Sequence, residues 1–301
     1  MLTQWLEAIG KGYGRCCVVR SRSIRSTLVK TIPMISGSRF ITGTCLILGG
    51  RGFVGSGVAV AAREAGWDVT VAGRAEVAGL SGARFDVVIN ANGNASRFRA
   101  EQDPWFDFEA SLVPVYHSLF DFEYERYVFL STVDVYNDTG SSQDTREETL
   151  IDPLALGAYG FHKRQAELCV MRTCPKFLVL RLGQMIGSGL KKGPVYDIIN
   201  DQPLWIDPTS RLPFMNTTNV GRVLFQLLEA DVDSQVFNVC GRTSIEFSRV
   251  MELVPTVSSQ QESLESAVQV YEVATDKLEK ICSVPDSWDE IKTFVSEALG
   301  E

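Results

Sequence analysis

A short glycine-rich segment places the strongest constraint on the fold of this chain. Gly49, Gly52 and Gly55 form a G-x-x-G-x-x-G pattern. The apolar segment Thr44–Leu48 precedes it, and a run of small residues, Val54–Ala65, follows it. Between a buried strand and a helix, such glycines permit a tight turn and let the backbone approach a pyrophosphate, whose charge the helix N-terminus attracts. The sequence therefore predicts a dinucleotide-binding strand–loop–helix unit.

Further apolar segments of strand length alternate with helical patterns along the chain. The expected strands are Trp67–Ala72, Asp86–Asn90, Arg126–Ser131, Phe177–Leu182 and Gln235–Val239. Alternation of this kind predicts an α/β fold with a doubly wound parallel sheet, the Rossmann fold, with a small C-terminal substrate-binding lobe. Only a short segment separates the second strand from Asp86, so we expect one strand–helix unit to be missing or reduced there.

The expected organisation has three parts. Residues 1–40 form a basic leader, residues 41–182 the NAD(P)-binding domain, and residues 183–301 a mixed region that completes the sheet and forms the lobe. Near the end, Ser287 and Glu290 have the spacing of a capping box, which predicts a helix that runs to about Leu299 and stops at Gly300.

The charge distribution is uneven. The chain carries a net charge of -8, yet residues 1–40 hold seven basic residues and one acidic residue, a balance of +6, which leaves -14 on the remainder. An acidic body argues against a nucleic-acid surface, because phosphate binding requires clustered Lys and Arg. Three interpretations of the leader stay open. It is a disordered tail, or sequence upstream of the true start codon at Met34, or a transit peptide, and the first two are favoured over the third.

Composition excludes several other classes. No apolar run approaches the length of a membrane span, so we expect no membrane partner. The seven cysteines contain no Cys-x-x-Cys pair, which favours a reducing, cytoplasmic location. With only His117 and His162 and no carboxylates at ligand spacing, we expect no metal site.

Arginines suggest which dinucleotide binds. In an NAD(H) site, an acidic residue at the end of the second strand would bind the adenosine 2'-hydroxyl. This chain has Arg74 at that position, and Arg51 lies within the glycine loop. Guanidinium groups suit a 2'-phosphate, so NADP(H) is favoured over NAD(H). Asn92 and Gly93 follow the next strand and are expected to line the cofactor site by position.

Tyr159 and Lys163 lie four residues apart on the expected helix Tyr159–Arg172 and project from one face. A tyrosine is a poor acid–base group at neutral pH, and a neighbouring ammonium is expected to lower its pKa. Upstream, Ser131 and Thr132 end a strand at the carboxyl edge of the sheet, where α/β enzymes bind ligands. This context favours an acid–base site.

These motifs, in this order from about Cys45 to Val239, resemble the extended short-chain dehydrogenase/reductase family, which includes nucleotide-sugar epimerases, dehydratases and reductases. The motifs are Gly49-x-x-Gly52-x-x-Gly55, Ser131-Thr132-x-x-Val135-Tyr136, Tyr159-x-x-x-Lys163 and Leu180-Arg181-Leu182-Gly183-Gln184-x-x-Gly187. The resemblance implies that Thr132 holds a substrate oxygen, that Tyr159 is the acid–base and that Lys163 also binds the nicotinamide ribose. Cofactor contacts are implied for the loop residues and for Phe53, Val54, Ser131 and Leu182, and substrate contacts for Asp134, Gln184 and Arg211.

The activity within this family stays open at this stage. Similar dehydratases carry an Asp-Glu pair after the threonine, whereas this chain has Val133-Asp134, which weakens dehydration. The resemblance implies an NAD(P)-dependent oxidoreductase or epimerase that acts on a nucleotide-linked sugar. The loop resembles that of NADPH-dependent reductases of 4-keto-6-deoxy nucleotide sugars, so reduction is favoured over epimerisation. A dehydratase or decarboxylase with retained NAD, and a non-catalytic NADP-binding redox sensor, are the alternatives. The resemblance also implies a possible homodimer.

Some residues are expected to have structural roles only. His162 points off the Tyr159–Lys163 face and is interpreted as a surface or packing residue. The aromatic residues after Trp105, among them Phe106, Phe108, Phe120 and Phe122, are interpreted as core.

Overall fold

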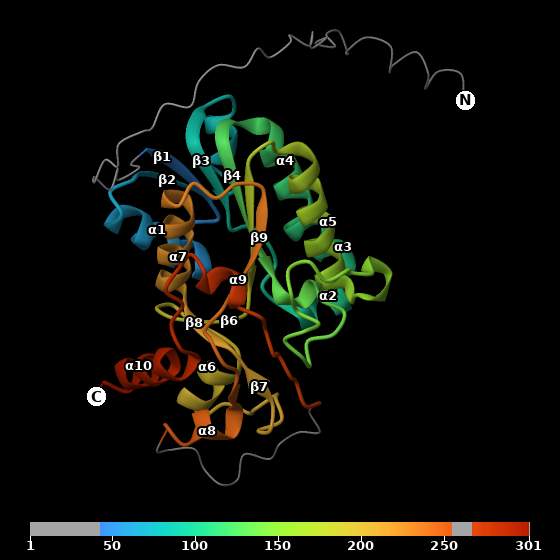
Figure 1. Ribbon diagram of the computed structural model, residues 1–301, viewed down its shortest axis with the longest axis vertical. Helices are drawn as coiled ribbons and strands as arrows, with labels where there is room; N and C mark the ends of the chain where they lie inside the picture. The colour runs from blue at the N-terminus through green and yellow to red at the C-terminus, as the bar shows by residue number, and fades with distance from the viewer. Residues whose placement is uncertain (1–42, 255–266, 301) are drawn as a thin grey trace, which may run out of the picture. The chain divides into compact units, whose positions relative to one another are not determined.

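The computed structural model describes residues 43–254 and 267–300 (Figure 1). Six strands form one parallel sheet in the order β2-β1-β3-β4-β5-β9. Their bounds are β1 Thr44–Leu48, β2 Asp68–Ala72, β3 Arg84–Asn90, β4 Glu123–Thr132, β5 Phe177–Leu182 and β9 Gln235–Val239. The predicted doubly wound α/β sheet is therefore confirmed.

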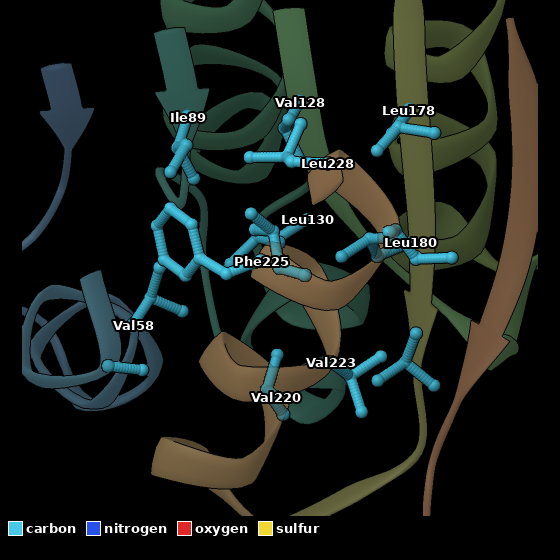
Figure 2. Close-up of a cluster of buried hydrophobic side chains, with 14 of the residues drawn as sticks. Val58, Ile89, Val128, Leu130, Leu178, Leu180, Val220, Val223, Phe225 and Leu228 are labelled. Carbon is cyan, nitrogen blue, oxygen red and sulfur yellow. The ribbon is translucent and has the colours of Figure 1, made fainter. Parts of the chain in front are cut away.

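Helices α1 (Phe53–Glu64) and α7 (Thr217–Glu229) cover one face of this sheet. They approach closely because glycines lie at their contact: a Cβ added at Gly57 would lie 2.5 Å from Thr217 Oγ1. Figure 2 shows α7 placing an apolar stripe, including Phe225, over strands β3, β4 and β5. The small side chains of α1 thus serve helix–helix packing as well as packing on the sheet.

The opposite face is covered by α4 (Val113–Asp121) and α5 (Ala158–Thr173). The shorter helices α2 (Arg97–Gln102) and α3 (Pro104–Ser111) precede α4 and pack beside α5. Between β2 and β3 the structure has one 3-10 turn, Val77–Leu80, which confirms that the expected strand–helix unit is reduced at this point.

A second hydrophobic core lies in the C-terminal part of the chain. Its strands are two short pairs, β6 (Gln184–Ile186) with β8 (Phe214–Asn216) and β7 (Arg211–Leu212) with β10 (Ile245–Glu246). Its helices are α6 Pro194–Ile199, α8 Phe247–Met251 and α10 Ser287–Leu299; α9, Asp276–Glu279, lies against β9 of the main sheet. We call this part the C-terminal lobe. The predicted basic leader, residues 1–40, lies outside the described residues.

Helix α10 has the predicted bounds but not the predicted cap. Its N-cap is Asp286, whose side chain accepts the backbone N–H of Trp288. Glu290 instead accepts hydrogen bonds from β8 and α7, and the hydroxyl of Ser287 accepts a backbone N–H of β8. The capping-box prediction is wrong because tertiary partners take both side chains. Gly300 ends the helix with a φ of 78°, as predicted.

Within residues 43–254 and 267–300, none of the helices combines the length and the apolar character that crossing a membrane requires.

Candidate active site

A cavity of about 800 Å³ opens where the carboxyl ends of the central strands meet. Most of the predicted site residues line it: Arg51, Gly52, Phe53, Val54, Asn92, Gly93, Ser131, Thr132, Asp134, Tyr159, Lys163, Leu182 and Gln184. Gly49 and Gly55 lie behind its wall, within the glycine loop, and Arg74 and Arg211 are not among the lining residues. Parallel strands that end at one sheet edge bring these residues together from distant parts of the chain.

The glycine loop fits a dinucleotide pyrophosphate. Gly49 has a φ of 72°, and a Cβ added at Gly55 would lie 2.4 Å from the carbonyl oxygen of Gly49, so neither position accepts a side chain without strain. Gly52 is the N-cap of α1 and forms no side-chain hydrogen bond there. The first N–H groups of α1 are therefore left for a ligand, as a phosphate at a helix N-terminus requires.

An acidic residue that was not predicted, Glu76, lies in the segment after β2, directly before the 3-10 turn. Glu76 Oε1 lies 2.6 Å from Arg51 Nη1, and its Oε2 accepts the N–H of Gly73 at 2.9 Å. The hydrogen bond from Arg51 lowers the pKa of Glu76. Arg74 is exposed, and the described residues offer it no polar partner. Of the two arginines predicted to bind a 2'-phosphate, Arg51 is paired with a carboxylate and Arg74 has no polar partner among the described residues.

Thr132, Tyr159 and Lys163 face one another from β4 and α5. Thr132 is the last residue of β4, and Tyr159 lies in the first turn of α5. Lys163 is only 5% exposed and donates from Nζ to the carbonyl oxygen of Leu130 at 3.1 Å. Helix α5 thus brings both residues of the Tyr-x-x-x-Lys pattern to the cavity that Thr132 lines.

The pKa values of this pair move in opposite directions. Burial raises the pKa of Tyr159, the carboxylates of Asp134 and Asp107 raise it further, and contact with the hydroxyl of Thr132 lowers it by less. Burial lowers the pKa of Lys163 to about 8, against the opposing effects of Asp107 and Glu167. We expected Lys163 to lower the pKa of Tyr159. The net shift is upward because burial and two carboxylates outweigh the contact with Thr132 and the positive charge of Arg97.

Ser131 faces a buried ionic network behind the cavity. Its Oγ donates to Glu167 Oε1 at 2.6 Å, and Glu167 also binds Arg181 at 3.0 and 2.9 Å and Arg164 at 2.7 Å. Arg181 is 1% exposed and stacks over the ring of Tyr136. This network fixes the end of β4 against α5 and β5.

Asp134 is bound on both carboxylate oxygens. Its Oδ1 accepts hydrogen bonds from Arg97 at 2.9 Å and from Tyr271 at 2.6 Å, and its Oδ2 accepts one from Thr132 at 3.1 Å. Arg97 also contacts the hydroxyl of Tyr271 and donates to Gln269. Arg97 and Tyr271 line the cavity and were both missed, because no motif surrounds them.

The remaining predicted substrate residues, Gln184 and Arg211, lie apart from one another. Gln184 lines the cavity, as do two lysines that were not predicted as site residues, Lys191 and Lys192. Lys192 donates to the carbonyl oxygen of Ala95 at 2.8 Å, so it holds the loop across the cavity rim. Arg211 is outside the lining and pairs with Glu272 at 2.6 Å. Among the described residues, no group of three or more His, Cys, Asp or Glu is placed to hold a metal ion.

Comparison with solved structures identifies the fold. A UDP-galactose 4-epimerase is 20% identical, with a TM-score of 0.69 over 85% of this chain and 98% of that one. MoeE5 in complex with UDP-glucose and NAD is 17% identical, with a TM-score of 0.73 over 86% and 99%. RMD from Pseudomonas aeruginosa, complexed with NADPH, is 17% identical, with a TM-score of 0.66 over 86% and 100%. Comparison with curated protein sequences finds no match.

The fold and the site define an extended short-chain dehydrogenase/reductase, as the resemblance implied. The family model described as "NAD dependent epimerase/dehydratase family" matches residues 45–240. The chain belongs to this family.

Proposed function

We propose that this protein is an NAD(P)-dependent oxidoreductase that reduces a keto group of a nucleotide-linked sugar, with NADPH as its preferred reductant. The observation that carries the proposal is the placement of Tyr159. Its side chain, a neutral phenol at neutral pH, lines the same cavity as Thr132, Lys163 and the glycine loop. A phenol in that position is equipped to give a proton to a carbonyl oxygen.

The residues divide the reduction between them. When bound, the cofactor supplies a hydride to the carbonyl carbon. The Thr132 hydroxyl orients the carbonyl oxygen, and Tyr159 donates its proton to that oxygen, so that the C=O group becomes a secondary alcohol. The Lys163 ammonium, held by the carbonyl of Leu130, stabilises the phenolate that remains until solvent returns the proton. Lys163 would hold the nicotinamide ribose of the cofactor, and the uncapped start of α1 would hold its pyrophosphate.

The environment of Asp134 argues against the dehydratase alternative. Elimination of water requires a side chain free to take or give a proton, whereas Asp134 is occupied by Arg97, Tyr271 and Thr132. An Asp134→Asn variant separates the two activities. Reduction should persist within about tenfold, a loss of about 1.4 kcal/mol in transition-state stabilisation. Elimination or decarboxylation by Asp134 with retained NAD should be abolished.

The cofactor preference rests on the arginines of the glycine loop and of the second strand. Arg74 is exposed at the end of β2, and Arg51 lines the cavity. A 2'-phosphate would compete with Glu76 for Arg51, since both are anions. The comparisons include a protein bound to NADPH and another bound to NAD, so relatives of this fold use either cofactor.

A homodimer, a cytoplasmic location and the absence of nucleic-acid partners complete the proposal. The aromatic residues of α3 and α4 that we interpreted as core are in part exposed: Trp105 is 66% exposed and Phe120 is 63% exposed, whereas Phe122 is buried. Tyr116 is 50% exposed, and its ring packs against that of Phe120. Exposed aromatic side chains on neighbouring helices support association with a second copy.

A non-catalytic redox sensor would need the glycine loop but not the Tyr159–Lys163 pair, so the pair favours an enzyme. The test is mass spectrometry of small molecules released from purified, denatured protein, followed by a screen of nucleoside-diphosphate keto sugars with NADPH. Exchangeable NADP(H) or an empty site, with turnover of a keto sugar, supports the reductase. Tightly retained NAD, with no turnover, contradicts it and points to an epimerase or dehydratase.

A further inference from the structure

Three carboxylates exert charge on the Tyr159–Lys163 pair, and they differ in their partners. Glu167 is paired with Arg181 and Arg164. Asp134 is paired with Arg97. Asp107 takes part in neither of these ion pairs, although its charge acts on both Tyr159 and Lys163.

Asp107 lies on α3 and is fully buried, with 0% of its surface exposed. Its Oδ1 accepts hydrogen bonds from Ser111 Oγ and Asn94 Nδ2, both at 3.0 Å, and its Oδ2 lies 2.8 Å from His162 Nδ1. In the described part of the chain, none of its hydrogen-bonding partners is an arginine or lysine. Burial of a carboxylate without a permanent cation is costly unless a positive charge lies nearby.

Lys163 is the cation on the cavity side of this carboxylate. A Cβ added at Gly93 would lie 3.0 Å from Lys163 Nζ and 3.6 Å from Ser111 Oγ, so the ammonium and the Asp107–Ser111 hydrogen bond border the same glycine. Lys163 is itself buried, and within the described ranges it makes one hydrogen bond, to the carbonyl of Leu130. A buried ammonium with a single neutral acceptor needs a counter-charge to stay protonated.

His162 completes the arrangement. Of the two roles expected for it, surface or packing, the structure shows packing. The side chain is buried, and its ring lies between the rings of Phe108 and Phe161, with centroids at 5.8 and 5.6 Å. Asp107 is the acidic group that it contacts. Because Asp107 is fully buried beside these rings, water is kept from its carboxylate and its charge is weakly screened.

We propose that Asp107 is a positioning residue of this site, the buried counter-charge that holds Lys163 as an ammonium ion and thereby keeps Tyr159 able to donate its proton. The catalytic consequence rests on the proposed function. The charge state of Lys163 does not depend on the proposed function. An experiment can therefore contradict the proposed function and still support Asp107 as the counter-charge.

The test measures Lys163 without substrate or cofactor. The rate at which acetic anhydride acetylates Lys163 is followed against pH by peptide mass spectrometry in the intact protein, which gives the apparent pKa of that amine. Asp107→Asn removes the charge and retains an acceptor oxygen for Ser111 and Asn94. We expect it to lower the apparent pKa of Lys163 by about one unit, as loss of a nearby opposite charge does. Asp107→Glu should restore most of the shift.

Glu109→Gln is the matched control, because it removes the same charge from an exposed position on the same helix. It should leave Lys163 unchanged. Equal pKa values in the wild type, Asp107→Asn and Glu109→Gln would overturn the proposal. If Asp107→Asn does not fold, the double variant Asp107→Asn/His162→Gln replaces the contact by an amide pair and is judged by the same criterion. A shift of Lys163 without any keto-sugar turnover would support the counter-charge and contradict only the proposed function.

Discussion

Tyr271 donates a 2.6 Å hydrogen bond to Oδ1 of Asp134. The two residues are 137 positions apart, and the bond joins the segment that follows residues 255–266 to the end of β4 at the cavity. Burial and the nearby Asp134 carboxylate raise the pKa of Tyr271, so its hydroxyl stays a donor over the physiological range. The contact therefore links the C-terminal part of the chain to the catalytic strand end through one charged hydrogen bond.

Removal of this bond should destabilise the protein. Tyr271→Phe leaves the Asp134 carboxylate with one donor fewer, and hydrogen bonds to charged groups contribute about 1.5–3 kcal/mol. We expect the free energy of unfolding, measured by urea denaturation, to fall by about that amount. Tyr116→Phe is the control, because Tyr116 is 50% exposed and makes no hydrogen bond with the described residues. Equal losses in both variants would show that the Asp134 contact contributes nothing specific.

Glu76 should weaken the binding of NADPH. Glu76→Ala frees Arg51 and removes an anion from the segment after β2, so the dissociation constant for NADPH should fall about tenfold while that for NADH changes little. Fluorescence titration of the reduced cofactor measures both. Glu125→Ala breaks another exposed ion pair, with Arg84 at 3.2 Å, whose residues do not line the cavity, and serves as the control. Tighter NADH binding without a change for NADPH would contradict the role given to Arg51.

The glycine loop offers a test of cofactor placement. A Cβ at Gly55 would lie 2.4 Å from a backbone oxygen, so Gly55→Ala must shift the loop, and affinity for NADPH should fall about tenfold or more. Gly79→Ala makes the same substitution where nothing lies within 4 Å, and it should bind like the wild type. Circular dichroism establishes that both variants fold. Undiminished binding by Gly55→Ala would place the cofactor elsewhere.

The rate of keto-sugar reduction should fall at alkaline pH. The Lys163 amine is needed as an ammonium, and its pKa is lowered by burial to about 8, so the protonated fraction declines as the pH rises through that value. Initial rates at saturating NADPH, measured between about pH 6 and 10, should decline with a midpoint near pH 8. A rate that stays level up to about pH 10 would mean that the charge on Lys163 does not matter for the chemistry.

Most of the fold could be predicted from local sequence patterns. Strands β1, β5 and β9 have the predicted bounds, because each is a short apolar run between clear breaks. The glycine loop and the Tyr-x-x-x-Lys helix were found because their spacing reflects a geometric need within one segment. The reduced connection between β2 and β3 was also predicted, from length alone.

The parts that were missed depend on residues distant in sequence. Asp134 was recognised, but its partners Arg97 and Tyr271 come from segments without a motif and meet it only in the fold. Glu76 follows the β2 end by too many residues to match a familiar spacing. His162 was assigned from helical position alone, which could not reveal that α3 brings Asp107 against it. Ser287 and Glu290 failed as a cap for the same reason.

The central claim is that Tyr159 gives a proton to a keto sugar as the cofactor gives a hydride. The direct measurement is transfer of deuterium from NADPH labelled at the nicotinamide C4 to a nucleoside-diphosphate 4-keto-6-deoxyhexose, detected by mass spectrometry of the sugar. The wild type should produce labelled alcohol, and Tyr159→Phe should produce none while it binds NADPH within a few-fold of the wild-type affinity. Equal labelling by the two proteins would contradict the role of Tyr159.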